Sequence, residues 1–169
     1  TLIKFRDGCL SIVEGDFLKF RYLLKKEFKI HDMSLSGQGI IIRAVRMGES
    51  QNVGDTRLDV DFVKDGEVTE HLSELDVPVK VDGQVVAVIN LEDPKPGFFN
   101  AEDQEIVEIL AGNISAALSR IENKKIIRES TNELVRSESR FKYLLDSAPM
   151  GITVNILGKI VYTNQHFAD

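Results

Sequence analysis

The chain has 169 residues, of which 43% are hydrophobic, enough for one well-packed core and part of a second. Its 27 acidic residues outnumber its 21 Lys and Arg residues, and the net charge of −6 argues against nucleic acid as a partner, because phosphate binding needs a basic face. No apolar run approaches the ~20 residues of a membrane span, and a single cysteine, Cys9, cannot form an internal disulfide and is typical of a cytoplasmic protein.

The N-terminal part predicts strands followed by one short helix. We expect a hairpin over Thr1–Val13 that turns at Asp7-Gly8. The apolar spacing of residues 17–30 fits a strand and a helix alike, so periodicity leaves both open. Residues Ile40–Met47 are expected to form a helix, ended by a glycine in the C-cap region.

Two further segments connect this part to the centre of the chain. Residues 51–63 are expected to form a short strand and then a loop, and Val68–Leu75 a helical turn. A loop with two prolines, residues 92–100, follows the central strands and closes off the sheet.

The clearest pattern lies in residues 76–110, which predict a hairpin and a helix. Alternating valines precede Asp82-Gly83, a pair that suits a two-residue hairpin turn. The returning strand, Gln84–Leu91, is apolar on both sides, with Val85 expected on the face of Ala87 and Val86 on the other, so it is expected to be central and covered on both faces. Asn100 is placed to cap the helix that follows.

The sequence resembles the GAF domain family in two consecutive segments. The first is SGQGIIIRAVRMGESQNVGDTRLDVDFV, and the second is DVPVKVDGQVVAVINLEDPKPGFFNAEDQEIVEIL. The resemblance covers residues 1–121 and implies an α/β (α+β) fold, with an antiparallel central sheet flanked by helices and a long C-terminal helix. It favours a strand for the first half of residues 17–30. Members of the family usually have a helix before the first strand, and we expect either that this member lacks it or that this sequence begins after it.

Beyond the GAF-like part the sequence becomes highly charged. Residues 122–140 lack proline and glycine and are expected to continue the helix as a signalling or coiled-coil linker. Residues 141–169 resemble the opening of a PAS domain, with LLDSAP, Gly151-Ile152, a Leu157-Gly158 turn and IVYTN, so a truncated hairpin is expected there. We expect a homodimer whose helices meet along one seam: Leu110, Ile114, Ala117, Ile121, Ile127, Leu134 and Phe141.

Polar residues at the family's ligand-covering segments give the candidate ligand site: Arg43, Arg57 and Asp59. For Arg57, an ion pair with a neighbouring aspartate is the competing interpretation. Cyclic-nucleotide-binding GAF domains are matched at Asn90, Phe99 and Asp103. Leu91 and Gln104 replace the lysine and glutamate of that pattern, which makes this ligand class unfavourable.

Catalytic and cofactor signatures are scarce. Free methionine sulfoxide reduction on this fold uses several cysteines, and bilin attachment uses a cysteine in a different setting from Cys9. His31, His71 and His166 are isolated in the sequence, so no bilin, haem or metal signature is present. We therefore expect no enzymatic activity in this chain.

By resemblance, the expected function is sensory. A GAF domain followed by a PAS domain is typical of sensor proteins, most often histidine kinases, whose output domain would belong to the same parent chain. The alternative is a dimerisation and scaffolding module without a ligand, in which side chains such as Phe17, Phe20 and Phe28 fill the pocket.

Overall fold

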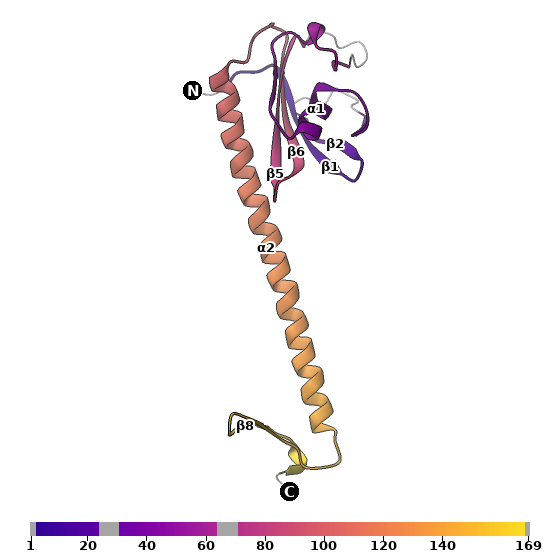
Figure 1. Cartoon of the computed structure of the whole chain (residues 1–169), viewed down its shortest axis with the longest axis vertical. Helices are drawn as coiled ribbons and strands as arrows, with labels where there is room; N and C mark the ends of the chain where they lie inside the picture. Colours follow the sequence, from indigo (N-terminus) through magenta and orange to yellow (C-terminus); the bar gives the residue numbers. More distant parts are fainter. Residues whose placement is uncertain (1–2, 24–30, 64–70, 168–169) are drawn as a thin grey trace. The chain divides into compact units, whose positions relative to one another are not determined.

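The structure is a computed structural model and describes residues 3–23, 31–63 and 71–167. It divides into two compact units, Thr1–Arg120 and Ile121–Asp169. The first unit is built on a six-stranded sheet (Figure 1). None of the helices in the described ranges is long and apolar enough to cross a membrane.

The six strands form one antiparallel sheet. In chain order they are β1 (Asp7–Glu14), β2 (Phe17–Leu23), β3 (Met33–Ser34), β4 (Gln51–Val53), β5 (Ser73–Val81) and β6 (Gln84–Asp93). Their spatial order is β3-β2-β1-β6-β5-β4, and each neighbouring pair is antiparallel. The predicted interior position of β6 is therefore confirmed.

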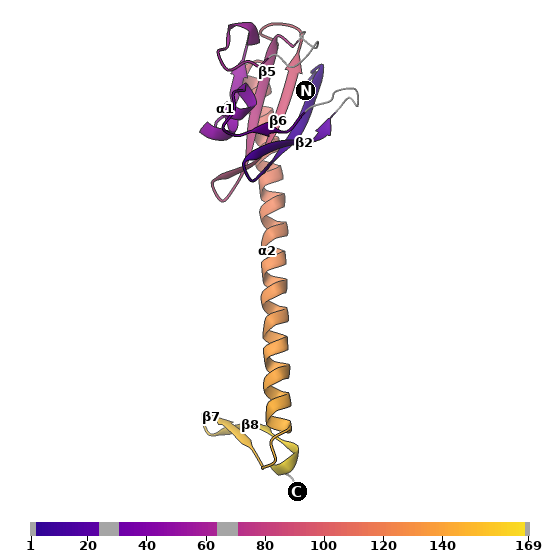
Figure 2. The ribbon, with the colours of Figure 1, turned by 90° about the vertical axis from the view of Figure 1, so that its right-hand side faces the viewer.

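Helices cover both faces of this sheet. Helix α1 (Ile40–Met47) packs on one face, and the first part of α2 (Ala101–Asp146) packs on the other, as the two views in Figures 1 and 2 show. A short 3₁₀ helix, η1 (Thr56–Leu58), follows β4. The predicted fold class, an antiparallel sheet flanked by helices with a long C-terminal helix, is confirmed.

Each face has its own apolar core. The core under α2 consists of Leu75, Val77, Val79, Ala87, Ile89, Leu91, Phe99, Val107 and Ala111. The core under α1 consists of Leu18, Ile41, Ile42, Ala44 and Val88. Because β5 and β6 have period two, one face of each strand contributes to the α2 side and the other to the α1 side.

The central hairpin has the predicted turn and an unpredicted bulge. Asp82 (φ 50°) and Gly83 (φ 81°) both adopt positive φ, as a two-residue turn of this kind requires. The register shifts between Val79 and Lys80, so that Val86 has no direct partner in β5. This bulge exchanges two side chains relative to strict alternation: Val86 packs on the α2 side with Ala87, and Val85 on the α1 side.

The predicted N-terminal hairpin is wrong in its turn. Asp7 and Gly8 lie inside β1, where they pair with Glu92 and Leu91 of β6, and the chain turns at Gly15 (φ 59°) instead. The strand interpretation of residues 17–30 is confirmed for Phe17–Leu23, and the remainder lies outside the described residues.

The end of α1 and the start of α2 follow local sequence signals, whereas the helical turn predicted before β5 does not agree with the structure at its end. Gly48 ends α1 in the left-handed conformation (φ 65°), with its N–H bonded to the carbonyl of Ala44. The Asn100 side chain accepts hydrogen bonds from the second and third residues of α2. The helical turn predicted for Val68–Leu75 is wrong at its end, because residues 73–75 belong to β5, and residues 68–70 lie outside the described residues.

The second unit contains the end of α2 and a hairpin of β7 (Thr153–Ile156) and β8 (Lys159–Thr163). A short 3₁₀ helix, η2 (Gln165–Phe167), follows. The buried Asn164 side chain ties the hairpin to the end of α2: its Nδ2 donates to the carbonyls of Leu145 and Met150 (2.9 Å each), and its Oδ1 accepts from the Ile152 N–H (2.7 Å).

Candidate functional site

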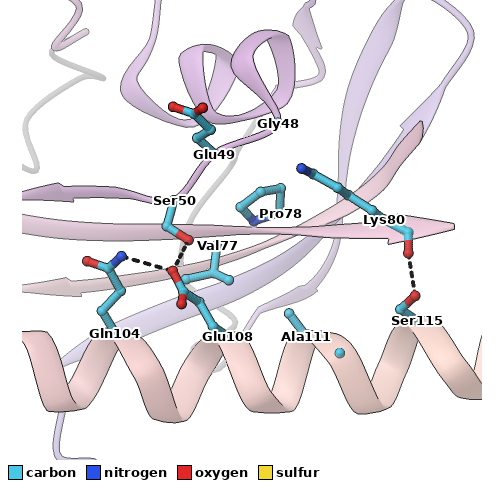
Figure 3. Close-up of a pocket in the computed structure, with 11 residues that line it drawn as sticks. Gly48, Glu49, Ser50, Val77, Pro78, Lys80, Gln104, Glu108, Ala111 and Ser115 are labelled. Atoms are coloured by element: carbon cyan, nitrogen blue, oxygen red, sulfur yellow. Dashed lines mark hydrogen bonds between the residues drawn. The ribbon is translucent and has the colours of Figure 1, made fainter. Parts of the chain in front are cut away.

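A groove of about 560 Å³ lies at the outer edge of β5, between α2 and the segment that follows α1 (Figure 3). Its size falls in the range of small-molecule sites. The groove is lined by Gly48, Glu49, Ser50, Val77, Pro78, Lys80, Gln104, Glu108, Ala111, Gly112 and Ser115. Val77, Pro78 and Ala111 supply apolar surface, and the other side chains add hydrogen-bonding and charged groups around it. We call this site the β5–α2 groove.

The groove exists because β4 is shorter than β5. The last pair between them joins Gln51 to Asp76, so from Val77 onward the outer edge of β5 has no strand partner among the described residues. Pro78 lies on this part of the strand, where the missing N–H of a proline does least harm. The Ser115 hydroxyl of α2 donates to the Lys80 carbonyl and holds the helix against this edge (Figure 3).

A fixed carboxylate stands at one end of the groove. Glu108 Oε1 accepts hydrogen bonds from Ser50 Oγ (2.6 Å) and Gln104 Nε2 (2.9 Å). These two bonds, that from Ser50 above all, lower the pKa of Glu108, so its carboxylate is ionised at neutral pH. Figure 3 shows all three side chains meeting at this end of the groove.

A second polar region lies on the α1 side of the sheet and contains two of the predicted site residues. Arg43 of α1 makes a bidentate contact with Asp59, through Nη1 to Oδ1 (2.9 Å) and Nη2 to Oδ2 (2.7 Å). It also bonds Asp61 (2.8 Å) and Gln51 (2.8 Å). The hydrogen bond with Arg43 lowers the pKa of Asp59. The structure therefore brings Arg43 and Asp59 together, with every donor group of the guanidinium engaged.

Arg57, the third predicted residue, lies apart from this pair. Its guanidinium bonds Asp55, with Nε to Oδ1 at 2.8 Å and Nη2 to Oδ2 at 2.6 Å, and its side chain is 59% exposed. The Asp55 side chain also accepts the Arg57 N–H and so caps η1. These contacts match the competing interpretation, a local ion pair.

The same sheet face holds a buried carboxyl pair that the sequence analysis missed. Glu74 and Asp76 lie two residues apart on β5, and the Asn90 side chain of β6 donates to both, at 3.3 Å and 2.9 Å. Burial raises the pKa of both carboxyls, and their proximity raises that of Glu74 further. The available signal was their period-two spacing, which puts both on the face opposite Val77.

His71 was predicted to be isolated, and the structure shows otherwise. Its Nε2 lies 3.0 Å from Asp7 Oδ2, and its Nδ1 lies 2.7 Å from Glu92 Oε2. The hydrogen bond with Glu92, followed by the smaller contribution of Asp7, raises the pKa of His71 above its ordinary value. The prediction failed because the two carboxylates are distant from His71 in the sequence.

Cys9 belongs to the edge of this polar face. Its thiol lies 3.6 Å from both Ser11 Oγ and Asn90 Oδ1, and burial raises its pKa to about 12. The thiol is thus protonated at neutral pH. Across the described residues, no group of three or more His, Cys, Asp and Glu side chains is placed to hold a metal ion.

The positions that match the cyclic-nucleotide pattern have separate structural roles. Asn90 bonds the carboxyl pair, and Phe99 is buried and meets Phe98 edge-on, with ring centroids 5.3 Å apart. Asp103 accepts the Asn100 N–H (3.0 Å) and completes the cap of α2.

The predicted dimer seam is exposed along most of its length. In the first unit Leu110 and Ala117 are exposed, whereas Ile114 packs against the core under α2. In the second unit all four seam residues are exposed: Ile121, Ile127, Leu134 and Phe141. The packing of a second chain along this seam remains a prediction. Ile114, which is partly buried, would contact such a chain only at the margin of the interface.

The fold and its groove define a class: an α+β domain with a curled antiparallel sheet, helices on both faces and a small-molecule-sized site beside its exit helix. The family model of the GAF domain matches residues 2–119, and the chain belongs to this family. None of the functionally curated proteins is similar enough to count as a match.

Several solved structures share this fold. The type II free methionine-R-sulfoxide reductase of Thermoplasma acidophilum is 20% identical, with a TM-score of 0.61, over 67% of this chain and 78% of that one. The free methionine-R-sulfoxide reductase of Neisseria meningitidis, solved with its substrate, is 20% identical (TM-score 0.62; 70% and 71% covered). The GAF domain of a phosphoenolpyruvate-protein phosphotransferase of Coxiella burnetii is 16% identical (TM-score 0.63; 72% and 76% covered).

These comparisons correct one sequence-based expectation. We expected no enzymatic activity, because catalytic signatures were scarce. Structures that share this fold include free methionine-R-sulfoxide reductases from several organisms, so the fold of this chain is one on which enzymes are built. At 18–20% identity the likeness concerns the fold.

Proposed function

We propose that this chain is the sensory GAF module of a larger signalling protein, and that it binds a small molecule in the β5–α2 groove. The observation that carries the proposal is the position of the groove. One of its walls is α2, the helix by which the chain leaves the domain, so a ligand there would contact the sheet and the exit helix together.

The proposed mechanism follows from the two walls of the groove, strand β5 and helix α2. A ligand that fits one packing of α2 against β5 better than another would shift the balance between them. Ser115, which bonds the Lys80 carbonyl, and Glu108, which bonds Ser50, are the α2 contacts that such a shift would change. Coupling between the groove and the next domain requires this difference in affinity.

We further propose a homodimer and a following PAS-like domain, with a histidine-kinase-like output in the parent chain. The exposed apolar residues of α2 support self-association. Apolar side chains of the β7–β8 hairpin are also exposed, Ile156 at 57% and Ile160 at 65% among them, and an isolated two-stranded hairpin is marginal in water. Further strands packed on this hairpin would cover them.

Native mass spectrometry of the full chain, purified gently from its expression host, tests the ligand proposal. We expect a reproducible bound mass on the wild-type protein and its loss in Gly112→Phe, since a side chain at Gly112 would enter open space in the groove. Gly112→Ala is the matched control for folding. An equal bound mass in Gly112→Phe would place the ligand elsewhere and overturn the groove assignment.

The alternative function is a dimerisation module that uses no ligand. The specific observation in its favour is the apolar stripe on α2, where Ile106, Ile109 and Leu110 are 40%, 59% and 50% exposed. A dimer of bare polypeptide mass that also fails to bind any component of a low-mass cell extract would favour this alternative.

A further inference from the structure

We infer that the β5–α2 groove selects a small zwitterion of the size of a dipeptide, with its two charges at opposite ends of an apolar body. This inference rests on the proposed function and names the class of its ligand. It is drawn from three features of the groove: a fixed carboxylate, an unpaired ammonium and apolar surface around them.

The carboxylate is that of Glu108. Its Oε1 takes both hydrogen bonds, from Ser50 and from Gln104, and its Oε2 has no hydrogen bond to any described residue. A side chain held this way is already oriented, so a ligand ammonium would meet an acceptor that loses little rotamer freedom on binding. A charge-assisted hydrogen bond of this kind is about twice as strong as a neutral one.

The ammonium is that of Lys80. Figure 3 shows its side chain reaching from β5 toward Gly48. A Cβ added at Gly48 would lie 3.1 Å from Lys80 Cε and 3.2 Å from Nζ, so the glycine leaves room for this position. Lys80 forms no ion pair with the described part of the chain, and its charge is available to a ligand carboxylate.

The surface between these charges is apolar. Among its apolar lining residues, Pro78 of β5 is half-buried, whereas Val77 of β5 and Ala111 of α2 are almost fully buried (1% and 4% exposed), and Gly112 adds no side chain. An apolar ligand body placed here would lose its contact with water, which favours binding. A second carboxylate, Glu49, gives the lining a net charge of −1 with Glu108 and Lys80, which disfavours ligands with an excess of negative charge.

An extended protein segment fits this edge poorly. Adding a strand to β5 would require free N–H and C=O groups on its outer edge. Pro78 has no N–H, and the Lys80 carbonyl is already bonded to Ser115. Helix α2 also lies along this edge (Figure 3). A compact small molecule is therefore the better occupant.

The test is a titration of the ¹⁵N-labelled full chain, followed by amide NMR. The probes are the dipeptides Val-Val, Leu-Leu and Phe-Phe, each compared with its N-acetyl form, which lacks the cation, and its amide, which lacks the anion. We expect at least one zwitterion to shift the amides of Ser50, Lys80 and Gly112. Its singly charged relatives should bind roughly tenfold more weakly or worse, because each loses one charge-assisted contact.

Charge variants provide the second readout. Lys80→Gln and Glu108→Gln should each weaken binding about tenfold, whereas Lys95→Gln and Glu105→Gln, which remove exposed charges outside the groove, should not. Equal affinity for the N-acetyl or amide form, or no groove shifts with any zwitterion, would overturn the zwitterion inference. If a component of low-mass cell extract still shifts the groove amides, the proposed function survives that outcome; if none does, both fail.

Discussion

At the scale of single residues, the two arginines predicted for the site differ in what surrounds them. Arg43 bonds two aspartates and a glutamine and is mostly covered, with 21% of its side chain exposed. Among the residues that the structure describes, Arg57 bonds only its near neighbour Asp55, from the surface. Bidentate, partly buried pairs contribute more than exposed pairs, which are screened by water.

We therefore predict unequal losses of stability for two matched substitutions. Arg43→Gln should lower the free energy of unfolding by about 2–3 kcal/mol, because it leaves Asp59 and Asp61 without their cation. Arg57→Gln should lower it by less than about 1 kcal/mol. Urea denaturation of the two variants measures both values, and equal losses would contradict this account of the cluster.

The buried pair of Glu74 and Asp76 predicts a pH dependence of stability. The pKa of Glu74 in the folded state lies above its ordinary value of 4.5, so its contribution to stability is complete below that pH and is lost as the pH rises through the folded-state pKa. The raised pKa of His71 acts in the same direction above its ordinary value of 6.5. The lowered pKa of Asp59 has the opposite effect: its contribution to stability is present above its ordinary value of 3.8 and is lost as the pH falls through the folded-state pKa.

Glu74→Gln separates this effect from the others. The amide keeps a hydrogen-bonding group beside Asn90 and does not titrate. Between pH 5 and pH 9 we expect the melting temperature of the wild type to fall relative to that of the variant by several degrees, the change expected for roughly 1 kcal/mol or more. A difference between the two proteins that does not change with pH would show that Glu74 is not the group responsible.

At the scale of elements, the sequence predicted best what short-range chemistry determines. The Asp82-Gly83 turn, the bounds of α1 and the Asn100 cap were correct, because each depends on a few adjacent residues. The turn of the first hairpin was misplaced because two dipeptides of Asp and Gly, Asp7-Gly8 and Gly15-Asp16, offer similar turn signals. Only the pairing of Gly8 with β6 decides between them.

The groove and the carboxyl pair needed three-dimensional information. The groove is lined by three segments that are distant in the sequence, and it depends on β4 ending at Gln51 beside Asp76. The carboxyl pair depends on Asn90 lying opposite Asp76 in the sheet. Of the predicted ligand residues, Arg43 and Asp59 proved to be neighbours, whereas Arg57 did not join them.

Gly112 of α2 gives a prediction about the stability of the helix that lines the groove. Glycine inside a helix is unfavourable by about 1 kcal/mol relative to alanine, and an added Cβ at Gly112 would meet nothing within 4 Å. Gly112→Ala should therefore stabilise the domain by about 0.5–1 kcal/mol. Thermal and urea denaturation measure this gain, and a loss of stability would contradict the open space in the groove.

The hairpin of the second unit depends on one buried side chain. Asn164→Ala removes three hydrogen bonds, one to Leu145 at the end of α2 and two to the segment between α2 and β7, and leaves the bond from Tyr162 to Asp146 in place. We expect faster amide exchange throughout β7 and β8 and no change in the first unit. Asn155→Ala, an exposed asparagine in β7, is the control, and similar exchange in both variants would contradict the role of Asn164.

At the scale of the whole molecule, the account links a ligand site to a helix that continues beyond the domain. The fold is shared by free methionine-R-sulfoxide reductases and by the GAF domain of a phosphoenolpyruvate-protein phosphotransferase, so the fold alone does not define the activity. This chain combines the β5–α2 groove with an α2 of 46 residues. The proposed sensor requires that α2 respond to the groove.

The most direct test is hydrogen–deuterium exchange of the full chain with and without low-mass extract from its host, on the wild type and on Gly112→Phe. Exchange reports local opening segment by segment. The account predicts that the extract slows exchange in residues 77–81 and 104–115 of the wild type, and that filling the groove abolishes the effect. No change in the wild type, or the same change in Gly112→Phe, would contradict the claim that α2 responds to a ligand in this groove.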